Sequence, residues 1–288
     1  MSYNSQSRRK SRLKPVIYGL LSFLLAFVLF LLSVFAVVQA TLFSQDYMLS
    51  KMGDSGYYAM VSDELKSELR SLCNASGLDE SFAEDFVAEL DINALEQRYI
   101  SSFYSGDKTL VDTKDFKQKL FDALDKYMDE KGIDKSKTSK ESLSYFVDQA
   151  SERYVNQISI PFFSYFANYI YKSSTPVTII TISLAAAALI IAAIIAFTNR
   201  FVHRRFRYLC YSCIGAFLAV TIIPAFVLIS GKISQINLNT RSLYNLFVSY
   251  ANGVFMNFIV CSAALLLLSA VTFILYRWHY NKAISHSR

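Results

Sequence analysis

Residues 177–197 have the sequence VTIITISLAAAALIIAAIIAF, a run of 21 residues with no Asp, Glu, Lys, Arg or His. A bilayer core about 30 Å thick is crossed by a helix of roughly 20 apolar residues. A buried helix of a soluble protein rarely stays free of charge over such a length, so this stretch predicts a membrane-spanning helix.

Three other charge-free stretches have the same character, and the chain as a whole is 53% hydrophobic. They are residues 16–42, 209–230 and 254–276. The first could alternatively be a cleaved signal peptide, because Val38-Gln39-Ala40 resembles a cleavage site. Signal-peptide cores have about 7–15 apolar residues, and this longer core favours an uncleaved anchor. We therefore expect an all-α membrane protein with four transmembrane helices. The alanines of residues 185–193 predict close helix contact for the second span.

The charges of the chain are separated along the sequence. All 23 acidic residues lie between Asp46 and Glu152. Residues 41–176 also contain 15 Lys and Arg, so this segment has a net charge of −8. The 14 other basic residues flank or connect the predicted spans. Twelve of them lie in three segments, which are the arm 1–15, the loop 198–208 and the tail 277–288.

This asymmetry predicts the orientation of the chain, because short loops rich in Lys and Arg remain on the cytoplasmic side. We expect a multi-pass protein of the cell membrane with both termini in the cytoplasm, and with residues 43–176 and 231–253 outside. The basic loop 198–208 is then a candidate for cytoplasmic docking or for setting the orientation. Its arginines are Arg200, Arg204, Arg205 and Arg207.

The segment 43–176 is predicted to form an all-helical extracytoplasmic domain with about five helices. Spacings of 3 and 4 residues, typical of one face of a helix, separate Tyr58, Val61, Leu65, Leu69 and Leu72. No segment shows the two-residue alternation of a strand. The domain is long enough to bury a core of its own. The loop 231–253 is predicted to contain a separate amphipathic helix.

Several residues predict helix boundaries in this domain. Asp91 and Thr113 are expected to be N-caps, and Gly77 and Gly106 are expected to end helices. Pro161 is expected to open a last aromatic helix that leads towards the second span.

Histidine and cysteine usage limits the chemistry of the outer segment. Residues 43–176 contain no His, so a Ser/His/Asp arrangement or a histidine zinc site is excluded there. Cys73 is its only cysteine, so it has no internal disulfide. We expect no cofactor and no catalytic residue, and an acidic, disulfide-free outer domain of this kind fits a bacterial surface protein.

The densest acidic run is a candidate cation site. Glu80 and Glu84, and likewise Asp85 and Glu89, are four residues apart and share a helix face. The run lacks the alternating Asp or Asn and the central Gly of an EF-hand loop. A solvated polar helix face is the other interpretation of these four carboxylates.

Two aromatic amphipathic stretches precede the second and fourth spans. The side chains concerned are Phe162, Phe163, Phe166 and Tyr169, and then Phe247 and Tyr250. Aromatic residues favour the headgroup level of a bilayer, so an interfacial belt is one interpretation. The other is an outer-leaflet aromatic surface beneath the domain that receives a lipid or a hydrophobic peptide.

The order of parts, one span, a large outer domain and three more spans, resembles the permease subunits of ABC systems of the macrolide-exporter and cell-division type. Their outer domains are typically mixed α/β, whereas this one is predicted to be helical. Three hypotheses for function follow. The first is a non-enzymatic envelope protein that binds a partner, peptide or cation outside. The second is a permease-like subunit that works with a cytoplasmic ATPase. The third is a membrane enzyme that uses carboxylates. We favour the first, with the lipid bilayer as a constant partner and no nucleic acid.

Overall fold

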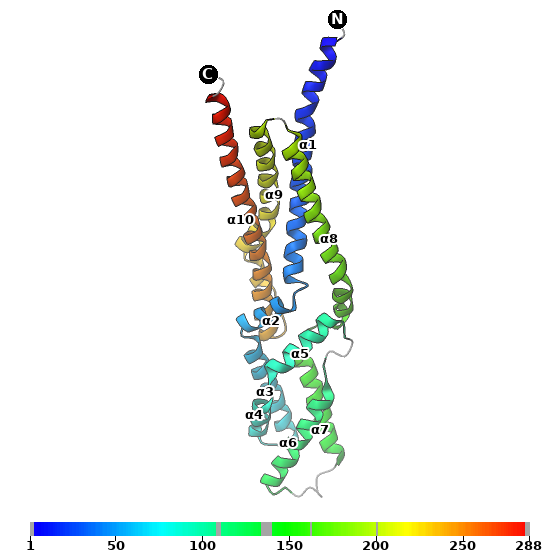
Figure 1. Cartoon of the computed structure of the whole chain (residues 1–288). Coiled ribbons are helices and arrows are strands. Elements are labelled where there is room, and N and C mark those ends of the chain that lie inside the picture. Colours follow the sequence, from blue (N-terminus) through cyan, green and yellow to red (C-terminus); the bar gives the residue numbers. More distant parts are fainter. Residues whose placement is uncertain (1–2, 108–110, 134–139, 162, 200, 286–288) are drawn as a thin grey trace. The chain divides into compact units, whose positions relative to one another are not determined.

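The computed structural model describes residues 3–107, 111–133, 140–161, 163–199 and 201–285. Every regular element within these residues is a helix, so the expected all-α class is confirmed for the described part of the chain. The chain divides into two compact units (Figure 1). The membrane unit comprises Met1–Leu42, Ser174–Gln235 and Ala251–Arg288, and the helical domain comprises Phe43–Ser173 and Ile236–Tyr250.

Four helices are long and apolar enough to cross a membrane. They are α1 (Tyr3–Thr41), α8 (Phe163–Thr198), α9 (Val202–Ser230) and α10 (Arg241–Ser285). Each helix is longer than one predicted span and contains it, except that the first predicted span ends at Leu42, just beyond α1. The chain is therefore a multi-pass membrane protein. The short 3-10 helix η1 (Lys232–Gln235) follows α9.

The aromatic stretch before the second span is not a separate helix. Residues 163–198 form the single helix α8, which begins two residues after Pro161 and continues through Pro176. A proline removes one backbone N–H donor from a helix, and this loss is tolerated in membrane helices. The predicted aromatic helix and the predicted span are therefore one unbroken element.

Close packing in the membrane unit involves small residues of α1 and α9. The Oγ atoms of Ser22 and Ser212 lie 3.0 Å apart. One turn further along, a Cβ atom at Gly215 would lie only 3.2 Å from the Cβ of Ala26. Small residues allow helix backbones to approach closely in a membrane. A close helix contact was predicted for the alanine-rich second span, and the third span makes one with α1. Ala188 of the second span is also buried, in a cluster with Leu25 and Val28 of α1.

Within the described residues, six helices form the body of the helical domain, one more than expected. They are α2 (Gln45–Asp54), α3 (Tyr57–Ser76), α4 (Glu80–Glu89), α5 (Ile92–Ser105), α6 (Thr113–Glu130) and α7 (Lys140–Ile158). The additional helix is α2, which has only two buried residues, Met48 and Met52, and therefore gives little periodic signal. Its amino end is capped by Ser44, which accepts a hydrogen bond from the Tyr47 amide.

The predicted helix boundaries are mostly confirmed. The Asp91 carboxylate accepts a hydrogen bond from the Ala94 amide at 3.0 Å and caps α5 as expected. The prediction for Thr113 is wrong, because Asp112 caps α6 by accepting from the Lys114 amide at 2.9 Å. The longer carboxylate is anionic and suits the positive end of the helix dipole, so Thr113 becomes the first helical residue.

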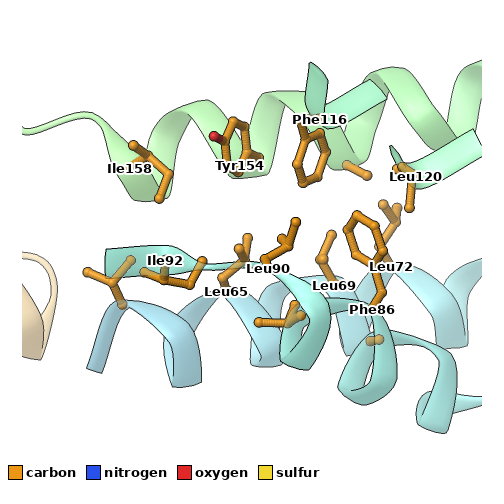
Figure 2. Packing of buried hydrophobic residues seen from close by; sticks show 14 of the residues in the cluster. Leu65, Leu69, Leu72, Phe86, Leu90, Ile92, Phe116, Leu120, Tyr154 and Ile158 are labelled. Atoms are coloured by element: carbon orange, nitrogen blue, oxygen red, sulfur yellow. The ribbon is translucent and has the colours of Figure 1, made fainter. Parts of the chain in front are cut away.

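One hydrophobic core holds these helices together (Figure 2). Leu65 and Leu69 of α3 lie opposite Tyr154 of α7 and Phe116 of α6, and the last two rings are stacked with centroids 4.1 Å apart. Leu246, from the first turns of α10, is 4% exposed and belongs to the same core. The amphipathic helix predicted in the loop 231–253 is the first part of α10 and is continuous with the fourth span, and residues 236–250 belong to the helical domain.

Candidate functional site

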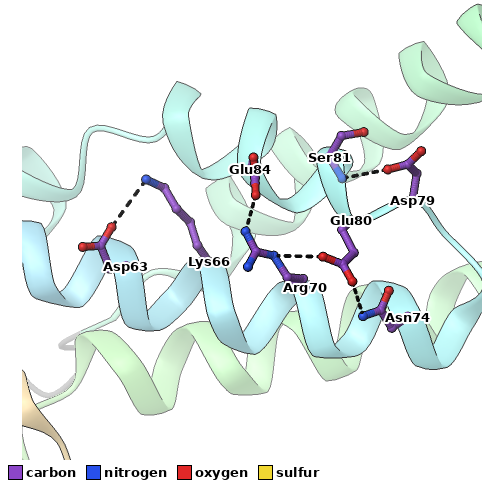
Figure 3. A network of polar contacts seen from close by, with 8 residues as sticks. All are labelled: Asp63, Lys66, Arg70, Asn74, Asp79, Glu80, Ser81 and Glu84. Atoms are coloured by element: carbon purple, nitrogen blue, oxygen red, sulfur yellow. Dashed lines mark hydrogen bonds and ion pairs between the residues drawn. The ribbon is translucent and has the colours of Figure 1, made fainter.

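The predicted acidic cation site is organised around an arginine (Figure 3). Arg70 of α3 forms ion pairs with both Glu80 and Glu84 of α4, and the Asn74 amide donates to Glu80 at 2.8 Å. Asp85 and Glu89 are exposed on α4. Among the described residues, no group of three or more His, Cys, Asp or Glu is placed to hold a metal ion. The arginine therefore neutralises the part of the run where two carboxylates converge.

The first aromatic stretch is divided between the core and the surface. The Phe163 ring lies 4.3 Å from the Phe103 ring, centroid to centroid, and packs inward. Phe166 is 55% exposed and Tyr169 is 68% exposed, and their neighbour Tyr165 is 80% exposed. Phe162 lies outside the described residues. We call Tyr165, Phe166 and Tyr169 the α8 aromatic stripe, because positions i, i+1 and i+4 lie on one side of a helix.

The second aromatic stretch packs mainly inward. Leu246 is buried, and the Tyr250 ring makes an edge contact with Tyr47 of α2 at a centroid distance of 5.5 Å. Phe247 is the more exposed of the two predicted aromatic residues, at 37%. The structure therefore does not bring the two stretches together as one exposed surface, and the α8 aromatic stripe is the larger exposed part.

Glu64 was not predicted as a functional residue, yet it joins two distant segments of the domain. Its carboxylate accepts hydrogen bonds from the Ser242 amide at 3.0 Å and from the Ser242 hydroxyl at 2.6 Å. Gln157 of α7 donates to the same carboxylate. Ser242 lies in the first turn of α10, where unpaired amides and the helix dipole favour an anion. Glu64 therefore anchors the amino end of α10 to α3 and α7.

Glu96 is a second acidic residue that sequence reasoning missed. It lies on α5 and is completely buried, and neither carboxylate oxygen has a hydrogen-bond partner among the described residues. Burial raises its pKa well above the ordinary value, because the charged form loses its hydration. Charge on Glu96 would in turn raise the pKa values of nearby tyrosines, which are Tyr57, Tyr58, Tyr99 and Tyr154.

Most of the predicted basic loop 198–208 is helical, because α9 begins at Val202 and contains Arg204, Arg205 and Arg207. Arg205 Nε donates to the Asn199 carbonyl oxygen at 2.8 Å. The Arg204 guanidinium lies over the Phe201 ring at 5.0 Å, and the Arg207 guanidinium lies over the Tyr208 ring at 5.1 Å. Arg200 lies outside the described residues. These contacts hold three of the arginines near the amino end of α9.

The described part of the helical domain contains a small internal cavity and a wider surface hollow. A cavity of about 20 Å³ between α5, α6 and α7 is lined by Tyr99 and Tyr154, and it has room for one water molecule rather than a metabolite. A wider surface hollow of about 790 Å³ is lined by Leu78, Leu124 and Phe146 among others. The wider hollow is bounded in part by residues next to the undescribed segment 134–139, so we assign it no ligand.

No protein-family model, no curated protein and no solved structure matches this chain.

Proposed function

We propose that the chain is a non-enzymatic envelope protein whose helical domain lies outside the cell and binds a partner protein there. The distribution of charge supports this orientation, because 12 of the 14 basic residues outside the segment 41–176 lie in the arm 1–15, the loop 198–208 and the tail 277–288. The common core of residues 43–173 and 236–250 supports the four-span topology, because in a four-span protein these two segments emerge on the same side of the membrane.

A binding role suits the side chains of the domain better than a catalytic one. The domain contains no histidine. The two converging carboxylates Glu80 and Glu84 are paired with Arg70, and the buried Glu96 has no second catalytic group beside it apart from tyrosines with raised pKa values. We accordingly propose neither a cation site on α4 nor a carboxylate-based reaction.

The observation that carries the proposal is the exposure of the α8 aromatic stripe. Exposed tyrosine and phenylalanine side chains provide large contact area at low entropic cost, and aromatic residues are enriched in the centres of protein interfaces. The domain around the stripe is acidic. We propose that the partner presents an apolar segment flanked by basic residues, and that it binds close to the outer leaflet, since the stripe precedes the second span in the same helix.

The stripe can be tested by photo-crosslinking in native membranes. A photoreactive phenylalanine analogue at Tyr169 should capture a protein partner. The same analogue at Tyr145, an exposed tyrosine on α7 at 67% exposure, should not. Crosslinks from Tyr169 to lipid alone would show an interfacial belt and overturn the binding proposal. Identical protein crosslinks from both positions would overturn the assignment to the stripe.

The permease-like alternative has less support. The described part of the domain is entirely helical, whereas permeases of the type that the topology resembles have mixed α/β outer domains. An ATPase subunit would need a docking surface in the loop 198–208, and Arg205 is already hydrogen-bonded to the chain's own carbonyl. We therefore do not propose that role.

A further inference from the structure

The surroundings of Glu96 are unusual for an acidic residue. It is fully buried at the centre of α5, and both of its oxygens lack a hydrogen-bond partner among the described residues. Glu64, in the same domain, has its carboxylate satisfied by Ser242 and Gln157. An ionised carboxylate without a partner is very unfavourable in an apolar interior, whereas the neutral acid costs much less. The packed core therefore selects the protonated form.

The titratable groups that face Glu96 do not oppose this selection. They are Tyr57 and Tyr58 on α3, Tyr99 on α5 and Tyr154 on α7. Burial is the only cause of the raised pKa of Glu96, and no Lys or Arg among the described residues offsets it.

We propose that Glu96 is a proton-binding switch of the helical domain. The packing of α5 against α3 and α7 requires a neutral carboxyl group at this position, and loss of the proton loosens α5 from its neighbours. The ligand of this site is the proton itself. The switch needs no partner on the α8 aromatic stripe and no particular orientation in the membrane, so it can hold whether or not the proposed binding function is correct.

The direction of the pH effect follows from proton linkage. The opened domain releases the Glu96 proton near the ordinary glutamate pKa of about 4.3, whereas the closed domain keeps it to higher pH. The closed form is therefore most stable below that ordinary value, and its stability falls as pH rises towards the raised pKa. In this window the opening equilibrium constant attributable to Glu96 should rise about tenfold per pH unit, which corresponds to about 1.4 kcal/mol.

Hydrogen–deuterium exchange on the full-length protein in lipid nanodiscs would measure this opening. We would compare the exchange of α5 amides at about pH 5, 6, 7 and 8, a range in which proton linkage should change the opening of α5. The proteins compared would be the wild type, Glu96→Gln and Glu152→Gln. Glu152 is exposed on α7 and matches the charge change. Comparing variants at one pH removes the intrinsic pH dependence of exchange. The wild type should open progressively more than Glu96→Gln as pH rises, and Glu152→Gln should follow the wild type. Identical pH dependence in the wild type and Glu96→Gln would overturn the switch.

A second measurement does not depend on the folding of a variant. The infrared carbonyl stretch of a protonated carboxylic acid is distinct from that of a carboxylate. The wild type should retain one protonated-carboxyl band at a pH where the exposed acids have ionised. That band should persist while the opening of α5 is still rare, and it should disappear only as the pH passes the raised pKa of Glu96 or most molecules have opened. If every carboxyl band vanishes with the exposed acids, Glu96 is ionised in the closed domain and the proposal is wrong.

Discussion

Glu64 and Glu96 show how surroundings decide the role of one residue type. Glu64 accepts hydrogen bonds from both the amide and the hydroxyl of Ser242, whereas Glu96 has no partner among the described residues. Neither role was visible in the sequence. Ser242 lies 178 residues from Glu64, too far for any local pattern to pair them. Glu96 lies between the buried Ile92 and Tyr99 on α5, whereas an acidic residue is ordinarily expected at the surface.

Replacement of Glu64 by Ala should loosen the first turns of α10. The substitution removes the acceptor of three hydrogen bonds, two from Ser242 and one from Gln157, and the anion at a helix amino end, so we expect a loss of about 1–3 kcal/mol in domain stability. Hydrogen–deuterium exchange should increase first in residues 241–250. Glu152→Ala, at an exposed position of α7, serves as the control. Equal exchange in the two variants would mean that Glu64 does not anchor α10.

Gly106 and Gly77 allow backbone strain and steric clash to be separated. Both glycines have positive φ angles, +75° and +73°, at the ends of helices. A Cβ atom at Gly106 would lie 2.8 Å from Tyr171 Cγ, whereas a Cβ at Gly77 would meet nothing within 4 Å. We expect Gly77→Ala to cost about 1 kcal/mol from its backbone conformation alone. Gly106→Ala should cost clearly more, and thermal unfolding of both variants would measure the difference.

The helices show which sequence patterns were sufficient to predict an element of secondary structure. Hydropathy predicted the four long helices, because membrane spans need a continuous apolar length and few other constraints. Periodicity found α3 but not α2, since ten residues with two buried methionines give too weak a signal. The aromatic stretch at the start of α8 was recognised, yet the division between the inward Phe163 and the outward Tyr169 depends on where α5 packs.

The contact between α1 and α9 should be sensitive to side-chain size. We expect Gly215→Leu to lower the thermal stability of the detergent-solubilised protein, because a Cβ there is already tight against Ala26. Overpacking of this kind typically costs about 1–3 kcal/mol. Gly19→Leu on α1, where a Cβ meets nothing within 4 Å, is the matched control. A larger loss from the Gly19 variant than from the Gly215 variant would contradict this packing.

At the scale of the whole molecule, the main feature that the sequence did not reveal is which segments of the chain make up the helical domain. Residues 43–173 and 236–250 are separated by two membrane-spanning stretches, and no periodic pattern connects them. Their association depends on Leu246 entering the core and on Glu64 binding Ser242. The orientation proposed for the chain, in contrast, rests entirely on charge that can be counted in the sequence.

Orientation can be tested by reversing the charge of the predicted cytoplasmic loop. A cysteine introduced at the exposed Ser76 should react with a membrane-impermeant thiol reagent in intact cells if the domain lies outside. Changing Arg204, Arg205 and Arg207 together to Glu should lower the labelled fraction, since the loop would no longer resist translocation. Labelling only after cell lysis, in the protein without the Glu changes, would show that the domain lies in the cytoplasm.

The burial of Leu246 in the core also sets an order of events during synthesis. A chain emerges from the ribosome with its amino end first, and domains begin to fold as they appear. Helices α2 to α7 are synthesised well before residues 236–250. Their hydrophobic core therefore remains incomplete until Leu246 has been synthesised. Closure of the domain can occur only after the third membrane-spanning helix has been synthesised. In a chain truncated before residue 236, the apolar site that Leu246 normally fills would stay exposed to other proteins, including those that remove incomplete chains.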